Sequence, residues 1–311
     1  MRIVYTLLAL LLALSASAQQ NPQYSQYIFN SMGINPAYTG SKNVLNVNAF
    51  HRTQWTGIDG APTTQALSID GITASNKLGI GLALTRDQIG AHSTISGYAN
   101  IAVKLPVSET GVFSLGLAPG LVQTKIDGNE LGIGDDPAIP ANSENSFRPD
   151  VKIGAYFHTQ RFYAGLSASD LLQFKDMDNI EPERHYYFTT GYVLDLGPFV
   201  KLKPSILMKE DFHSPTSVDL NAFVLLADRL WLGSSYRTSM NLFNNTPEME
   251  GMKNRTAIAF IGELQIHKSF RLGYAYDKML NDMDAFNTHE ISVGYYFFRK
   301  NDTKMLTPQY F

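Results

Sequence analysis

Histidine, serine and acidic residues are the side chains in this sequence whose chemistry could support metal binding or catalysis. The histidines are dispersed along the whole chain, at His51, His92, His158, His185, His213, His267 and His289. None forms a His-x-x-x-His pair on one helical face, and none joins a carboxylate cluster with the spacing of metal ligands. We therefore predict no metal site.

Nucleophilic catalysis is not indicated either. Serine, histidine and aspartate are abundant enough to form a lipase-like trio in space, but no Gly-x-Ser-x-Gly motif or other nucleophile signature is present. The chain has no cysteine, which removes thiol catalysis, disulfides and thiolate metal sites. We predict that the protein is not an enzyme and has no catalytic residues.

Glycine-rich and acidic stretches could in principle bind a nucleotide or calcium. The stretches Gly79–Gly81 and Gly116–Gly120 lie within alternating patterns and open no helix, so glycines that leave room for neighbouring groups, or that allow a bend at Pro119-Gly120, account for them better. The acidic runs Asp127–Glu130 and Asp135-Asp136 lack the ligand spacing of an EF-hand. We predict no cofactor.

Composition narrows the class of protein further. The 311 residues include 25 Lys and Arg against 28 Asp and Glu, a net charge of −3, which argues against a basic surface for nucleic acid. Hydrophobic residues make up 44% of the chain, with 24 Gly, 16 Tyr and 18 Phe. This balance is typical of strands that are apolar on one face and polar on the other, with aromatic belts that contact membrane lipid.

The first residues have the pattern of a cleavable signal peptide, Met1–Ala18. Arg2 gives a positive start, Ile3–Leu14 a short apolar run, and Ala16-Ser17-Ala18 an A-x-A cleavage site before Gln19. The apolar run is too short for a spanning helix, and no later apolar run is longer. We therefore predict export without a helical membrane anchor.

Most of the remaining chain shows period-two alternation, which predicts half-exposed β-strands. The expected strands are Val44–Trp55, Thr63–Thr73, three runs that begin near Leu78, Ile95 and Phe113, and then Val151–His158, Phe162–Ser169, Tyr186–Leu196, Phe199–Met208, Val218–Leu226, Leu230–Arg237, Thr256–Ile266, Phe270–Asp277 and Glu290–Phe298. This makes about 14 strands, each near the length of a tilted membrane strand. No linker divides the chain, so a single all-β domain is expected.

The lengths of the connections distinguish a membrane barrel from a soluble sandwich. Short connections such as Thr159-Gln160 and Gly197-Pro198 alternate in register with longer ones such as Asp87–Ser93 and Asp127–Pro149. Turns on one side and loops on the other are typical of an outer-membrane barrel. Since an open sheet edge in hydrocarbon leaves main-chain groups unpaired, the first and last strands must meet. The sequence predicts a transmembrane antiparallel β-barrel with both ends of the chain on the short-turn, periplasmic side.

Many charged and amide side chains fall on the faces that would point into such a barrel. They are Arg52, Gln54, Asp70, Lys104, Lys201, Lys203, Asp219, Asn221, Arg237, Glu263, Gln265, Arg271 and Asp277. They could line a ligand path or a partner pocket. The interpretation that we favour is a network that satisfies a filled interior, because polar groups in a lumen need partners whatever the function.

The stretch Tyr24–Gly40 is rich in aromatic residues but does not alternate. Asn35-Pro36 disfavours helix, and Gly40 permits a left-handed backbone. A flexible tether would leave its many apolar side chains exposed to water. We therefore expect this segment to dock on the barrel, below or inside its mouth, with Tyr38 and Trp55 packed against the wall. The predicted division is a lead-in at 19–42, a barrel at 43–298 and a periplasmic tail at 299–311.

The same residues carry a resemblance to a known family. The motifs PQYSQY-x-FN, INPAYTGS, HRTQW and the terminal TPQYF resemble the PorP/SprF family, as do SASDLLQ, RHYYFTTGY, LKPSILMK, LWLGSSYR and LGYAYD in the second half. The motif positions that we single out as structural or partner-binding are Tyr24, Tyr27, Phe29, Asn35, Pro36, Tyr38, Gly40, Arg52, Gln54 and Trp55. Together the motifs span essentially the whole mature chain.

The resemblance implies an outer-membrane barrel of Gram-negative bacteria that works with components of the type IX secretion system. It implies no catalytic or cofactor residues. Some members of that family help to export a large adhesin and to hold it at the surface through its C-terminal domain, in support of gliding motility. The leading hypothesis is therefore a secretion accessory that anchors cargo. A transport channel or porin, and an outer-membrane hydrolase with a Ser/His pair, are the alternatives.

Overall fold

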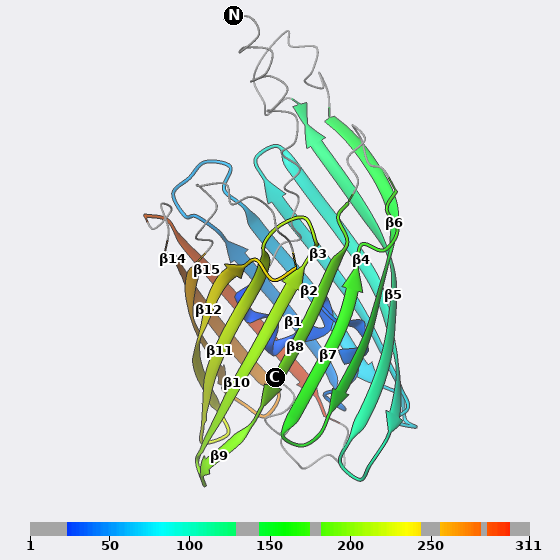
Figure 1. Cartoon of the computed structure of the whole chain (residues 1–311), viewed down its shortest axis with the longest axis vertical. Coiled ribbons are helices and arrows are strands. Elements are labelled where there is room, and N and C mark those ends of the chain that lie inside the picture. Colours follow the sequence, from blue (N-terminus) through cyan, green and yellow to red (C-terminus); the bar gives the residue numbers. More distant parts are fainter. Residues whose placement is uncertain (1–23, 129–142, 175–181, 244–255, 281–284, 299–311) are drawn as a thin grey trace, which may run out of the picture.

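A computed structural model describes residues 24–128, 143–174, 182–243, 256–280 and 285–298, which form one antiparallel barrel (Figure 1). The predicted signal peptide and the tail at 299–311 lie outside the described residues. No helix in the described part of the chain is long and apolar enough to cross a membrane.

The wall is a single sheet of fifteen strand segments. Their bounds are β1 Leu45–Thr53, β2 Thr63–Ile72, β3 Leu78–Ile89, β4 His92–Pro106, β5 Val112–Asp127, β6 Ser143–His158, β7 Phe162–Ser169, β8 His185–Tyr192, β9 Leu194–Gly197, β10 Val200–Glu210, β11 Thr216–Leu226, β12 Leu230–Met240, β13 Ala257–Gln265, β14 Phe270–Met279 and β15 Asn287–Phe297. Because β8 and β9 both pair with β10 and only Val193 separates them, they fill one position of the wall. The barrel thus has fourteen strand positions, which confirms the predicted fold.

Pairing between the first and last strands closes the sheet. Strand β1 pairs with β15 from Leu45 opposite Phe297 to Thr53 opposite His289, while every other neighbour in the wall follows in sequence order. Closure satisfies the main-chain donors and acceptors of both end strands, as the hydrocarbon of a membrane requires.

The two faces of the wall differ as the alternation predicts. On β3, the large side chains of Ile80, Leu82 and Leu84 are exposed on the outside, whereas Gly79 and Gly81 face the lumen. Buried charged and amide side chains gather inside the barrel, including most of those that the sequence places there. An apolar outside and a polar inside is the arrangement of a wall that contacts lipid.

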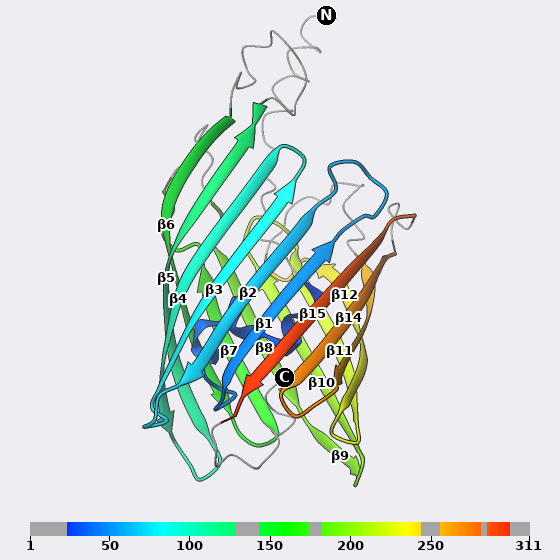
Figure 2. The same cartoon turned by 180° about the vertical axis from the view of Figure 1, so that it is seen from behind.

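The connections are sorted between the two ends of the barrel. At the tight-turn end they span residues 73–77, 107–111, 159–161, 198–199, 227–229 and 266–269. At the long-connection end they span residues 54–62, 90–91, 128–142, 170–184, 211–215, 241–256 and 280–286. Figures 1 and 2 show the two ends at the bottom and top of the barrel.

Two predicted connections are longer than the ones observed. The expected loop Asp87–Ser93 is reduced to Gly90-Ala91, because β3 and β4 stay paired up to Ile89 opposite His92. The expected loop Asp127–Pro149 is also wrong at its second end, because β6 begins at Ser143 and pairs with β5 along its whole length. The sequence-based start of β6 at Val151 missed this extension.

Residues Tyr24–Lys42 form a plug inside the barrel (Figures 1 and 2). Three short 3₁₀ helices make up most of it, η1 Ser25–Phe29, η2 Ser31–Gly33 and η3 Pro36–Tyr38. Most of its residues are buried, and the others are half-buried. The sequence analysis left open whether this segment lies below the barrel mouth or inside it. In the structure it lies inside the barrel.

The plug runs from the long-connection end toward the tight-turn end. Ser25 bonds to Asp277 and Glu290, which lie near the long-connection ends of β14 and β15. At the other end of the plug, Ser41 accepts a hydrogen bond from Lys104, whose main chain bonds to the tight turn at Lys77. Residues 24–42 of the expected periplasmic lead-in, 19–42, therefore descend through the lumen before β1 turns back upward.

Glycines on the inner wall make room for the plug. A Cβ atom added at Gly79 would overlap the carbonyl of Thr39, and one at Gly116 would overlap the main chain of Pro36 and Ala37. At Gly81 it would stand 2.9 Å from the Met32 sulfur. Side chains at these wall positions would occupy the space of the plug, so these glycines form its socket.

This fit predicts that Gly116→Val displaces the plug without opening the wall. The added side chain collides with plug backbone, and overpacking of this kind costs about 1–3 kcal/mol. Protease should then cut within residues 24–42 of a barrel that still migrates as a folded, heat-modifiable protein. Gly97→Val is the matched control, because its Cβ would approach only the Leu84 side chain, at 3.1 Å. Equal protease resistance in both variants would contradict the socket.

Candidate functional site

The contact between the plug and the wall is the principal assembly of buried polar and aromatic groups in the described chain. Near η1, Tyr27, Ile28 and Phe29 pack against Phe223 and Trp231 of the wall. The rings of Phe29 and Phe223 meet edge to face with centroids 5.8 Å apart. The Tyr27 hydroxyl accepts a hydrogen bond of 2.9 Å from the Asn221 amide, so this buried tyrosine is also satisfied.

A second aromatic contact holds the other half of the plug. Tyr38 is 2% exposed, and its ring meets that of Tyr156 edge to face at 5.4 Å. Met32 and Ala37 belong to the same buried cluster, with Tyr163 beyond them. The prediction that Tyr38 packs against the wall is confirmed.

Asn35-Pro36 is the bend between these two halves. The Asn35 amide donates to the carbonyls of Ala155 and Leu166, at 3.0 and 3.2 Å, while its oxygen accepts from the Ala37 N–H at 2.9 Å. Pro36 begins η3, where its missing N–H costs nothing. The dipeptide thus starts the helix and ties it to β6 and β7.

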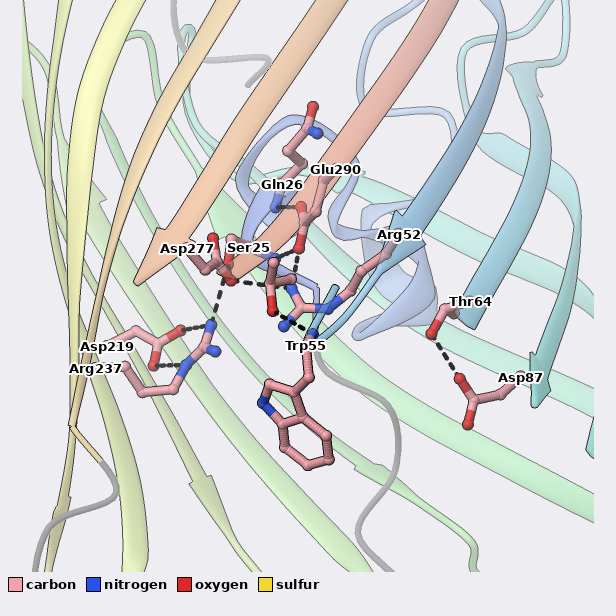
Figure 3. A network of polar contacts seen from close by, with 11 residues as sticks. Ser25, Gln26, Arg52, Trp55, Thr64, Asp87, Asp219, Arg237, Asp277 and Glu290 are labelled. Carbon is pink, nitrogen blue, oxygen red and sulfur yellow. Dashed lines mark hydrogen bonds and ion pairs between the residues drawn. The ribbon is translucent and has the colours of Figure 1, made fainter. Parts of the chain in front are cut away.

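An ion-pair network anchors the start of the plug (Figure 3). Arg52 pairs through Nη1 with Asp277, at 3.1 Å, and with Glu290. The plug's Ser25 N–H donates to Glu290 at 2.7 Å, and the Ser25 hydroxyl donates to Asp277 at 2.6 Å. The same carboxylates therefore bind both the wall arginine and the plug.

Arg237 extends this network along the wall. Its guanidinium pairs with Asp219 through two nitrogens, at 3.0 and 3.3 Å, and reaches the Ser25 hydroxyl at 3.4 Å. The Gln26 N–H donates to the second oxygen of Glu290 at 3.0 Å. Planar, two-pronged contacts of this kind fix orientation as well as charge.

A separate polar group holds the end of the plug near the tight turns. Asp70 accepts hydrogen bonds from the Gly40 N–H and the Asn46 amide, both at 2.8 Å. The Lys42 ammonium donates to the Phe29 carbonyl at 2.9 Å. Gly40 itself has a φ of +70°, in the left-handed region that glycine favours.

Most of the predicted motif residues meet in this assembly, but two do not. Gln54 only donates its N–H to the Pro62 carbonyl in the β1–β2 connection. Trp55 has a φ of +46°, is half-buried in that connection, and directs its indole away from the ion pairs (Figure 3). Trp55 was expected to pack against the wall, and its N–H does donate to the Thr288 hydroxyl of β15 at 3.3 Å, away from the Tyr38 cluster.

Other inward residues were misjudged or missed. Lys201 and Gln265 lie at the tight-turn rim, where they contact Asp228 and the Lys268 carbonyl instead of the plug. Glu290 was missed, although Thr288, Glu290 and Ser292 alternate on the inner face of β15 and carried the same signal as Asp70.

The contacts of this assembly attach the plug to the barrel wall. Its carboxylates are bound by guanidinium, hydroxyl and main-chain donors, as described above. Within the described residues, no group of three or more His, Cys, Asp or Glu could hold a metal ion. The arrangement fixes a folded segment in the lumen.

The network predicts a large effect for Arg52→Met. Two buried carboxylates then lose their counter-charge, and breaking a buried pair in this way costs about 3–5 kcal/mol. We expect a lower guanidinium midpoint for loss of the heat-modifiable gel shift, partly restored by Glu290→Gln in the same chain.

Arg161→Met is the matched control. Its partner Asp195 is exposed, and surface pairs contribute about 0–1 kcal/mol. Equal effects of the two substitutions would show that the buried network does not hold the plug.

We compared the sequence and the fold with those of known proteins. No curated protein matches the chain. Among solved structures, the CymD monoaromatic hydrocarbon channel is similar with a TM-score of 0.53 and 10% identity, over 86% of this chain and 93% of that one. A Pseudomonas aeruginosa FadL homologue has a TM-score of 0.48 and 10% identity, over 86% of this chain and 94% of that one. Identities this low show the fold alone.

The sequence itself matches one family model. The model describes the type IX secretion system membrane protein PorP/SprF, and it matches residues 16–295. The match includes the plug and almost the whole barrel, the parts that the motifs and contacts above join together. This outer-membrane β-barrel therefore belongs to the PorP/SprF family of type IX secretion system membrane proteins.

Proposed function

We propose that this protein is a plugged, non-enzymatic accessory of the type IX secretion system that anchors an exported adhesin at the cell surface through the adhesin's C-terminal domain. The observation that carries the proposal is the filled lumen. A barrel whose interior is occupied by its own chain acts through its two outer ends.

The contacts of the plug favour this role over that of a solute channel. The plug is bound near the long-connection end by Arg52, Asp277 and Glu290, and near the tight-turn end by Asp70. Aromatic contacts fill the space between them. A conducting state would have to break both polar groups and expose this aromatic surface.

The long-connection end is the better recognition surface. Its connections at residues 128–142, 170–184 and 241–256 are long enough to form a binding face, and loops on a rigid scaffold are where binding residues concentrate. We assign this end to the external medium and to the cargo. The proposed link to gliding motility follows from the family resemblance.

The tight-turn end is assigned to the secretion machinery. The lead-in Tyr24–Gly40, whose motif residues were singled out as structural or partner-binding, is largely buried in the lumen. The short turns, together with the tail Lys304–Phe311 that lies outside the described residues, take its place in the proposal.

Deleting the gene tests this function. We expect one or a few large adhesins to be absent from the cell surface while general secretion continues, with display restored by the wild-type gene. Surface biotinylation with mass spectrometry measures both. A null strain that displays its full surface proteome but fails to take up a solute would replace the anchoring role with a channel.

A further inference from the structure

Strand β6 has an edge that no described strand covers. It pairs with β5 along its whole length, from Ser143 opposite Asp127 to His158 opposite Val112. With β7 it pairs only from Ile153 opposite Ala168 onward. The segment 143–152 therefore presents its second edge without a partner strand among the described residues.

The direction of the main-chain groups at this edge can be assigned. The Val151 carbonyl accepts a hydrogen bond of 3.4 Å from the Leu171 N–H, so residue 151 faces the β7 side. Alternate residues of a strand face the same way, and the β5–β6 register has no shift, so Pro149, Phe147 and Asn145 also face this edge. Pro149 has no N–H to satisfy. Among the described residues, the main-chain donors and acceptors of Phe147 and Asn145 on this side have no main-chain partner.

The described residues Leu171–Phe174 of the neighbouring connection contact β6 only at the start of this edge. Leu172 donates its N–H to the Asp150 side chain at 3.5 Å, and Phe174 then bonds back to the Leu172 carbonyl at 3.0 Å. The Gln173 amide also reaches the Pro182 carbonyl at 3.5 Å. Among the described residues, these contacts cover the edge as far as Val151.

The edge lies where the apolar outer wall ends. Leu121 is exposed on β5, but the next outward residue, Gln123, is polar and bonds to Asn145 at 3.3 Å. Phe147, opposite Gln123, is 61% exposed. Figures 1 and 2 show β5 and β6 standing above the other strands at the long-connection end.

We propose that the edge Ser143–Phe147 binds an extended strand of the exported cargo by β-augmentation, an inference that rests on the proposed function and assigns its binding site. Main-chain groups of the added strand would pair with those of Asn145 and Phe147, and an apolar side chain would cover the Phe147 ring. Exposed edges of this kind are templates for an added strand.

A second copy of this chain does not fit the edge. Antiparallel pairing of two identical edges places the two-fold axis across the strands, which would turn one barrel upside down in the membrane. Lipid cannot supply an alternating row of main-chain donors and acceptors. The partner that fits is a strand from a protein outside the membrane.

Photocrosslinking in living cells tests the proposal. A photoreactive phenylalanine derivative at Asn145 should give an adduct with the adhesin that is lost from the surface of the null strain. The matched control is the same derivative at Gln88, which lies in the same row as Asn145 through Ser93 and Lys125 but has paired strands on both sides. It should give no such adduct.

Substitution at Phe147 separates main-chain from side-chain binding. Phe147→Pro removes the N–H and should reduce the Asn145 adduct at least about tenfold, whereas Phe147→Ala keeps the N–H and should reduce it less. Heat-modifiable migration confirms that both barrels fold.

Equal loss in the proline and alanine variants, an adduct of lipid or of a second copy, or no adduct at Asn145 would overturn the edge as the binding site. If one of these results is obtained but the null strain still loses its adhesin, the anchoring function is supported and only the binding site at the β6 edge is wrong.

Discussion

The seam between β1 and β15 is the contact on which the rest of the structure depends. A membrane barrel exists only if its first and last strands pair, because an open edge in hydrocarbon leaves main-chain groups without partners. Arg52 and Glu290 lie directly opposite each other across this seam, and Glu290 also binds the main chain of Ser25 and Gln26. The pair that joins the two ends of the wall therefore also fixes the start of the plug.

The plug fills the lumen of this barrel, which in a channel would be the path of the solute. The CymD channel and this chain share a barrel, but the likeness reaches the fold alone. Here the inner wall carries glycines where the plug backbone approaches, and carboxylates where its N–H groups point. The wall and the plug are complementary in shape and charge, as expected of parts that stay together.

Alternation made the wall predictable from sequence, because each strand residue faces either lipid or the lumen. It placed Asp70, Glu263 and Arg271 inside, where they are buried. The prediction of strands was wrong where apolar and polar residues do not alternate. Residues 143–149 alternate poorly and contain Pro149, so they were assigned to a loop, although a proline fits a strand edge that no described strand covers.

The position of the plug was harder to predict than its existence. Its contacts join residues far apart in the chain, such as Ser25 with Glu290, and no local pattern encodes them. The inner glycines Gly79, Gly116 and Gly154 carried a signal of close approach, but not the identity of the approaching segment. Trp55 was assigned to the first strand because its motif continues the β1 pattern past Thr53, where the strand ends.

The central claim is that the plug stays in the lumen while the protein works. Asn30 and Ser68 contact each other between plug and wall at 2.6 Å, and the chain has no cysteine of its own, so a disulfide in an Asn30→Cys/Ser68→Cys variant would lock the plug in place. The direct measurement is adhesin display by cells that carry the oxidised variant. Display equal to wild type is the result that we predict, and loss of display that a reductant restores would contradict the account.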